Sequence, residues 1–136
     1  MKIYVNRVPE QGVDLEADYD PSVLEMNRPD VQVAGPLQLH GRATLESKEL
    51  FVSVEVAYRL ELTCARCLES VDTHAVKAFF LHYDTTQQQV VDITSDVRQE
   101  IMLAYPIVVL CRTDCRGLCL VCGANMNKGS CQHKGA

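Results

Sequence analysis

The sequence predicts an α+β fold, in which an antiparallel β-meander and two short-to-medium helices carry a C-terminal cysteine-rich loop. Two observations support this prediction. Between residues 31 and 83, apolar and polar residues alternate with a period of two, which indicates strands with one buried face. In addition, five of the seven cysteines lie between Cys111 and Cys131, and this density is typical of a metal-bound loop.

The length of 136 residues is sufficient for one domain with its own core. We expect a single domain over residues 1–136, with a body at 1–110 and a cysteine-rich tail at 111–136 that packs on it. The sequence has no signal-peptide pattern and no apolar run of roughly 18–20 residues, so a soluble, cytoplasmic protein is expected. Cysteines remain reduced in that compartment, and they therefore indicate metal or redox chemistry rather than disulfides.

The first elements are short. Residues 2–7 alternate weakly and predict a strand, whereas the acidic residues 9–20 predict a loop. A short helix is expected over 20–26, because Asp20 can cap its free N–H groups and Pro21 suits the first helical position.

The alternating region predicts three strands. The first runs over residues 31–46 and is expected to bend near Gly35, which precedes a proline. The second runs over 50–63 and has the clearest alternation in the chain, and the third runs over 71–83. Each is expected to bury one face and to leave the other polar.

The rest of the body is predicted to be mixed. Residues 84–89 form a polar loop, and 90–91 form a short strand. A helix then follows and is ended by Pro106. Residues 107–110 form a short buried segment. The helix is expected to be capped by Thr94, Ser95 or Asp96 and to bury Val97, Ile101 and Ala104.

Two C-x-x-C pairs are the main candidates for chemistry. In such a turn two sulfurs converge on one point, and paired thiolates favour a soft tetrahedral cation, for which zinc is the first choice. One pair lies on the reversal between two predicted strands, and the other lies in the tail before a glycine. The ligand set favoured by this pattern is Cys64, Cys67, Cys119 and Cys122. A zinc ion held by four cysteines has no open position, so the site is expected to be structural.

A local ligand set is the alternative. It consists of Cys115, Cys119, Cys122 and Cys131, and it needs only a short loop closure. His133 lies two residues after Cys131 and could replace a cysteine ligand.

The cysteines also allow interpretations without a metal. Buried free cysteine often behaves as a small apolar residue. Cys111 follows an apolar run and is expected to be such a filler, and Cys64 continues an apolar strand face. A C-x-x-C pair can also be redox-active, which makes a thiol redox or metal sensor a further alternative.

Charge is unevenly distributed. The net charge is −5, but the tail carries four basic residues and one acidic residue. Four zinc-bound thiolates would reduce this excess from +3 to about +1, and the tail has no aromatic residue for base stacking. Direct RNA binding therefore stays an alternative. For a protein that acts mainly through protein contacts, the candidates for limited RNA contact are Arg66, Arg112, Arg116, Lys128 and Lys134.

The sequence offers no pattern for catalysis. It has no Ser/His/Asp order, glycine-rich phosphate loop or H-E-x-x-H motif. His40, His74 and His82 are scattered on alternating strands and are expected on the surface. We therefore expect a protein that is not an enzyme.

Two cysteine signatures carry a family resemblance. A C-x-R-C-L-E motif spans Cys64 to Glu69, and the segment from Cys115 to Asn127 forms a second signature. Together they resemble the YceD family, the large ribosomal RNA subunit accumulation proteins of bacteria and chloroplasts. The resemblance implies a non-enzymatic factor that supports large-subunit ribosomal RNA accumulation and ribosome assembly. Its partners would be the assembly machinery or the RNA itself, chiefly through protein contacts, with no membrane and no DNA.

Overall fold

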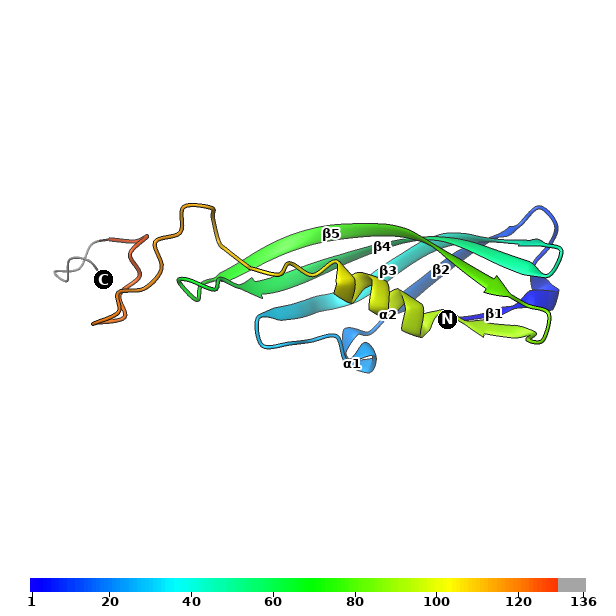
Figure 1. Ribbon diagram of the computed structural model, residues 1–136, viewed down its shortest axis with the longest axis horizontal. Coiled ribbons are helices and arrows are strands. Elements are labelled where there is room, and N and C mark those ends of the chain that lie inside the picture. The colour runs from blue at the N-terminus through cyan, green and yellow to red at the C-terminus, as the bar shows by residue number, and fades with distance from the viewer. Residues whose placement is uncertain (130–136) are drawn as a thin grey trace.

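The computed structural model describes residues 1–129 (Figure 1). Its elements in chain order are β1 (Lys2–Tyr4), the 3-10 helix η1 (Val5–Arg7), β2 (Val13–Tyr19), α1 (Pro21–Leu24), β3 (Val31–Glu46), β4 (Glu49–Thr63), β5 (Ser70–Asp84), β6 (Val90–Asp92) and α2 (Thr94–Leu103). The four strands β2-β3-β4-β5 form one antiparallel sheet in that order, and β1 pairs with β6 in a second, small sheet. The predicted fold class is confirmed. No helix among the described residues is long and apolar enough to cross a membrane.

The three predicted long strands are confirmed as β3, β4 and β5. The ladder of β4 with β5 has no register shift between Glu49 and Thr63. The ladder of β3 with β4 shifts its register between Ala34 and Gln38, at the predicted bend, where Gly35 has a φ of 75°. Alternation in the sequence therefore predicted the strands, and Gly35 with the proline after it predicted their interruption.

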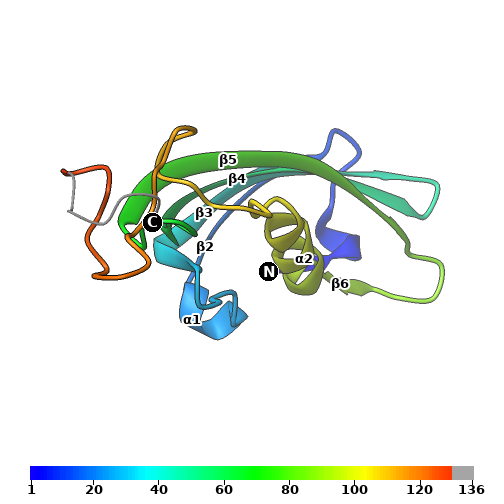
Figure 2. The ribbon, with the colours of Figure 1, turned by 60° about the vertical axis from the view of Figure 1, so that its left-hand side comes forward.

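The sheet is curved, and the other elements lie on its concave side (Figures 1 and 2). In Figure 2 the four strands arch over α1 and α2. The helix α2 places Val97 and Ile101, both fully buried, against this side. Arg98 of α2 donates to Leu24 O at 2.6 Å, which joins the two helices. The core thus lies between the concave face and these helices.

The helix predicted over 20–26 is present as α1, although it is shorter. The Asp20 side chain accepts a hydrogen bond from Ser22 N at 2.9 Å, and Pro21 occupies the first position, as predicted. The chain leaves the helix at Glu25, which has a φ of 51°.

The loop predicted over residues 9–20 was wrong. This segment contains β2, which pairs with β3 from Val13 to Tyr19. Its inward residues are half-buried, whereas the acidic residues between them are exposed on the other face. Because β2 is an edge strand, its buried face is weakly apolar, and the acidic residues obscured the alternation.

Two details of the following helix were also wrong. The cap residue is Ile93, and it is the Asp92 carboxylate that accepts from Thr94 N at 3.0 Å. Ala104 is exposed. The segment expected to be buried after Pro106 is buried only in part, since Ile107 is 96% and Val108 is 64% exposed, whereas Val109 is buried.

Gly41 is a position where the sheet should not tolerate a side chain. A Cβ atom on Gly41 would lie 2.5 Å from Ser53 O of the neighbouring strand. We expect Gly41→Ala to lower the free energy of unfolding by about 1–3 kcal/mol, because backbone would have to move. Gly129→Ala is the matched control, since nothing lies within 4 Å of that Cβ. Equal urea midpoints for both variants would contradict the tight approach of β3 and β4.

Candidate metal centre

The turn between β4 and β5 carries the first cysteine pair. Leu68 N donates to Cys64 O at 3.0 Å, and Cys64 N donates to Glu69 O at 2.9 Å. Leu68 closes this turn with a φ of 62°. These bonds place the Cys64 and Cys67 side chains at the end of the longest strand pair, where both are buried.

The chain after α2 returns to the same turn. Ala65 N donates to Val109 O at 2.8 Å, so the residues that follow Val109 lie beside the turn. Arg66 Nη1 donates to Cys115 O at 3.0 Å. These two contacts on either side of Cys111 fix the start of the tail against the β4–β5 turn.

Four cysteines meet at this junction. Cys64 Sγ lies 3.7 Å from Cys115 Sγ, and Cys67 Sγ lies 3.5 Å from Cys111 Sγ. All four sulfurs lie within 4.8 Å of one another. Sulfur ligands about 2.3 Å from a zinc ion at the centre of a tetrahedron lie about 3.8 Å apart. The cluster could therefore hold a metal ion of that kind.

The thiols have unequal acidities, and the reasons are local. Burial opposes ionisation of Cys64, but backbone N–H donors, including that of Cys67, outweigh it and lower its pKa to about 6. A hydrogen bond of 3.2 Å from Asn127 Nδ2 likewise lowers the pKa of Cys115. Burial, together with the neighbouring sulfurs, raises the pKa of Cys111 to about 12. Four thiolates this close repel one another, so full ionisation of the cluster requires a bound cation.

The structure groups the predicted ligands differently from the expected set. Cys64 and Cys67 are in the cluster, but Cys119 and Cys122 are not. Cys115, which was considered only for the local set, joins the first pair. Cys131, the other alternative ligand, lies outside the described residues, as does His133.

Cys111 is the residue that sequence reasoning missed. It was expected to be an apolar filler, but it is half-buried and its sulfur faces that of Cys67. The apolar run 107–110 before Cys111 favoured the filler interpretation. The useful signal was the position of Cys111 and Cys115 directly after the segment that returns from α2.

Polar contacts extend the junction along the tail. Glu69 Oε1 accepts from Lys128 Nζ at 2.9 Å and from Asn125 Nδ2 at 3.2 Å. The hydrogen bond from the Lys128 ammonium holds the pKa of Glu69 below its usual value, and the hydrogen bond from Asn125 adds to this effect. Gly117 also lies against the turn, because its Cβ would be 3.2 Å from Arg66 O. Figure 1 accordingly shows the tail at the β4–β5 end of the sheet.

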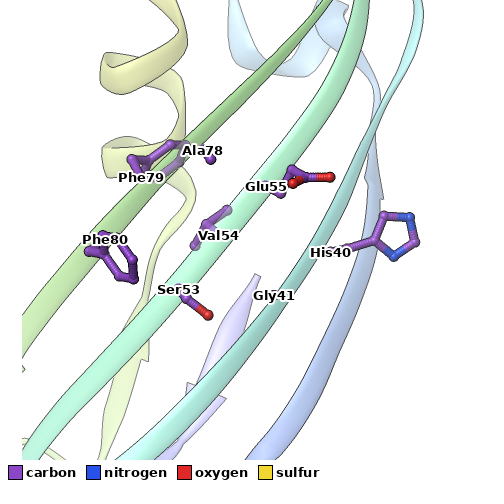
Figure 3. Close-up of a pocket in the computed structure, with 8 residues that line it drawn as sticks. All are labelled: His40, Gly41, Ser53, Val54, Glu55, Ala78, Phe79 and Phe80. Atoms are coloured by element: carbon purple, nitrogen blue, oxygen red, sulfur yellow. The ribbon is translucent and has the colours of Figure 1, made fainter.

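The open face of the sheet has a shallow hollow (Figure 3). It spans β3, β4 and β5, and the side chain of Phe80 at its border is 86% exposed. Its polar side chains have other partners. His40 Nδ1 lies 3.5 Å from Glu16 Oε1, and Ser53 Oγ donates to Arg42 O at 3.4 Å. His40 and Ser53 thus each contact a partner other than one another. The other two histidines of the sheet, His74 and His82, are exposed as predicted.

Comparison with known proteins supports the resemblance found in the sequence. Residues 82–136 match the family described as "Large ribosomal RNA subunit accumulation protein YceD". The C-terminal part of the chain is thus similar to the YceD family. The matched part includes Cys111 and Cys115, whereas Cys64 and Cys67 precede it.

Similar proteins occur in bacteria and plants. The uncharacterized protein YlbN of Bacillus subtilis is 22% identical over 81% of this chain and 72% of its own. The uncharacterized protein ML1660 of Mycobacterium leprae is 29% identical over 71% of this chain and 52% of its own. The chloroplastic "Large ribosomal RNA subunit accumulation protein YCED homolog 1" of Arabidopsis thaliana is 37% identical over 38% of this chain and 16% of its own. No solved structure matches.

Proposed function

We propose that this protein supports the accumulation of large-subunit ribosomal RNA as a non-enzymatic, cytoplasmic assembly factor. Its cysteine cluster would hold a structural zinc ion through Cys64, Cys67, Cys111 and Cys115. The observation that carries the proposal is the position of the cluster. It joins the β4–β5 turn to the part of the chain that matches the YceD family.

The ribosomal role is supported by the names of the family and of the plant relatives. Both name large ribosomal RNA subunit accumulation. The plant proteins share only part of this chain, and that part is little more than one third of it. Because the shared part is small, the ribosomal role of the whole protein is a proposal that the experiment below tests.

Zinc is the metal that suits the donor set best. Four thiolates form a soft, tetrahedral site, and zinc accepts this geometry without redox chemistry. Three of the four sulfurs belong to buried residues, so a bound ion would be shielded from water. Such a site has no position for a substrate, which supports a structural rather than a catalytic role.

Protein contacts are the more favourable way for this chain to act. Two cations of the tail already have partners, since Arg112 lies 3.5 Å from Asp114 and Lys128 pairs with Glu69. The net charge of −5 also opposes broad attraction to RNA. In contrast, Ile107 and Val108 are exposed apolar residues beside the cluster, as interaction surfaces often have.

A complementation experiment tests this function. We expect deletion of the gene to lower the ratio of large- to small-subunit ribosomal RNA, and the wild-type gene to restore it. A Cys64→Ser variant should fail to restore it, because it removes a ligand from the buried cluster. Gln87→Ala is the control, because this exposed residue lies in the polar loop after β5. A normal RNA ratio in the deletion strain would contradict the proposal.

Direct RNA binding has a separate test. Filter binding of the purified, metal-loaded protein to large-subunit RNA fragments should show weak binding. A tight interaction that falls steeply with salt would favour an RNA-binding module instead. In that case Arg116→Ala should reduce the affinity, since Arg116 is an exposed basic residue of the tail.

A further inference from the structure

The open face of the sheet, on its convex side, has no helix or strand over it in the described part of the chain. Both α-helices and the small sheet of β1 and β6 lie on the concave side (Figure 2). Two large apolar side chains of the edge strand β5 lie on the open face, since Phe80 is 86% and Val76 is 63% exposed. Ala78 lies between them on the same face, so the three residues form an apolar patch on the surface.

Small residues beside this apolar patch leave hollows in the open face. Phe80 pairs across the strands with Ser53, and Val76 pairs with Ala57. Each pair borders a shallow hollow, and the two hollows follow one another along β4 and β5 (Figure 3 shows the first). An apolar side chain of a partner that enters such a hollow would pack against Phe80 or Val76, as anchor residues do at protein interfaces.

The open face around the apolar patch is acidic. Its two arginines are neutralised within the face, because Arg42 lies 2.7 Å from Asp14 and Arg59 lies 2.8 Å from Asp72. Other carboxylates of the face have no lysine or arginine partner among the described residues. They are Glu16, Asp18, Glu55 and Glu61. The face therefore presents uncompensated negative charge next to exposed apolar side chains.

This combination favours one class of occupant over the others. RNA and anionic lipid surfaces carry charge of the same sign as the open face and would be repelled by it. A second copy of the chain that met this face with its own would bring carboxylates together, which also costs free energy. A polypeptide segment rich in lysine or arginine, with apolar residues between its charges, complements both the carboxylates and the apolar patch.

We propose that the open face binds a lysine- or arginine-rich segment of a partner protein. Phe80 and Val76 anchor its apolar residues, and Glu16 and Glu55 bind its cations. The strand register supports this grouping, because Glu16 and Glu55 lie in the row of residues next to that of Phe80. The inference goes beyond the proposed function, since it concerns a surface separate from the metal cluster and does not depend on ribosomal RNA.

Fluorescence anisotropy of the full-length protein with a defined peptide tests the proposal. The probe is a short labelled peptide in which lysine alternates with leucine and valine, and a matched peptide has glutamate in place of lysine. We expect the wild type to bind the lysine peptide with an affinity that falls as salt rises, and not to bind the glutamate peptide. No binding of the lysine peptide, or equal binding of both peptides, would overturn the proposal.

Variants locate the binding on the open face. Phe80→Ala should weaken it about tenfold or more, whereas Leu103→Ala, which removes an exposed apolar side chain from α2, should leave it unchanged. The double variant E16Q/E55Q should weaken both the binding and its salt dependence, and Glu100→Gln on α2 is its control. A loss in E16Q/E55Q without any effect of Phe80→Ala would mean unspecific attraction between charges, which would overturn the site.

Sedimentation velocity of the same proteins tests a second copy as the occupant. Phe80→Ala should leave the oligomeric state of the protein unchanged. A dimer that this variant dissociates would assign the open face to a second copy and overturn the proposal, as would RNA binding that Phe80→Ala abolishes. These measurements do not use the ribosomal RNA ratio of the deletion strain, so failure of this proposal is distinguishable from failure of the ribosomal function.

Discussion

A Cys67→Ser variant is expected to lose the metal ion proposed for the four-cysteine cluster and to release the start of the tail from the β4–β5 turn. Cys67 is 4% exposed, and its sulfur lies 3.5 Å from that of Cys111. Structural zinc sites contribute on the order of 10 kcal/mol to the folding of small domains. Here the sheet has its own core, so we expect the loss to be local. The Ala65 amide, which donates to Val109 O, should exchange its hydrogen roughly tenfold faster or more.

Hydrogen exchange followed by mass spectrometry, with metal analysis of the same sample, measures this result. Cys122→Ser is the matched control, because it makes the same chemical change outside the cluster. Protection of the peptide that contains Ala65 should be kept in this control. Unchanged exchange in Cys67→Ser would mean that backbone contacts, and not a metal, hold the tail in place.

The second large effect is expected at the interface of α2 with the sheet. Ile101 is fully buried, and its replacement by alanine should lower the free energy of unfolding by about 2–5 kcal/mol. Leu103 lies on the same helix but is 72% exposed. Leu103→Ala should therefore change the free energy by no more than about 0.5 kcal/mol.

Urea unfolding followed by circular dichroism compares the two variants at the same metal loading. Both replace a large aliphatic residue by alanine in one helix, so their helix propensities change in a similar way. The difference between them reports the packing of Ile101 on the concave face. Similar urea midpoints for the two variants would show that α2 contributes little to the stability of the sheet.

The strands were predictable because burial of one face imposes a period of two. The pattern from Leu50 to Leu62 places every second residue on the concave side, and the structure buries each of them. The helix α1 was predictable for a different reason, since Asp20 and Pro21 act through their immediate neighbours. In both cases the physical cause lies within a few residues of its effect.

The grouping of the cysteines was not predictable in this way. Cys64 and Cys115 are 51 residues apart in sequence, and their contact depends on the path of α2 and of the segment after it. A short spacing such as that of Cys119 and Cys122 shows that two sulfurs can share an ion, but it does not show which other pair completes the site. The strand β2 was missed for the same reason. It is stabilised by its pairing with β3, which its own composition does not reveal.

The length of the strands has a consequence for how the protein responds to change. At about 3.3 Å per residue, the 15 residues of β4 separate the cysteine end of the sheet from the opposite end by about 50 Å. Perturbations more than about 10 Å apart with no shared partners combine additively. A substitution in the β3–β4 hairpin and one at Cys67 should therefore have effects that simply sum. The sheet thus acts as a spacer, and we expect its two ends to contribute independently to stability.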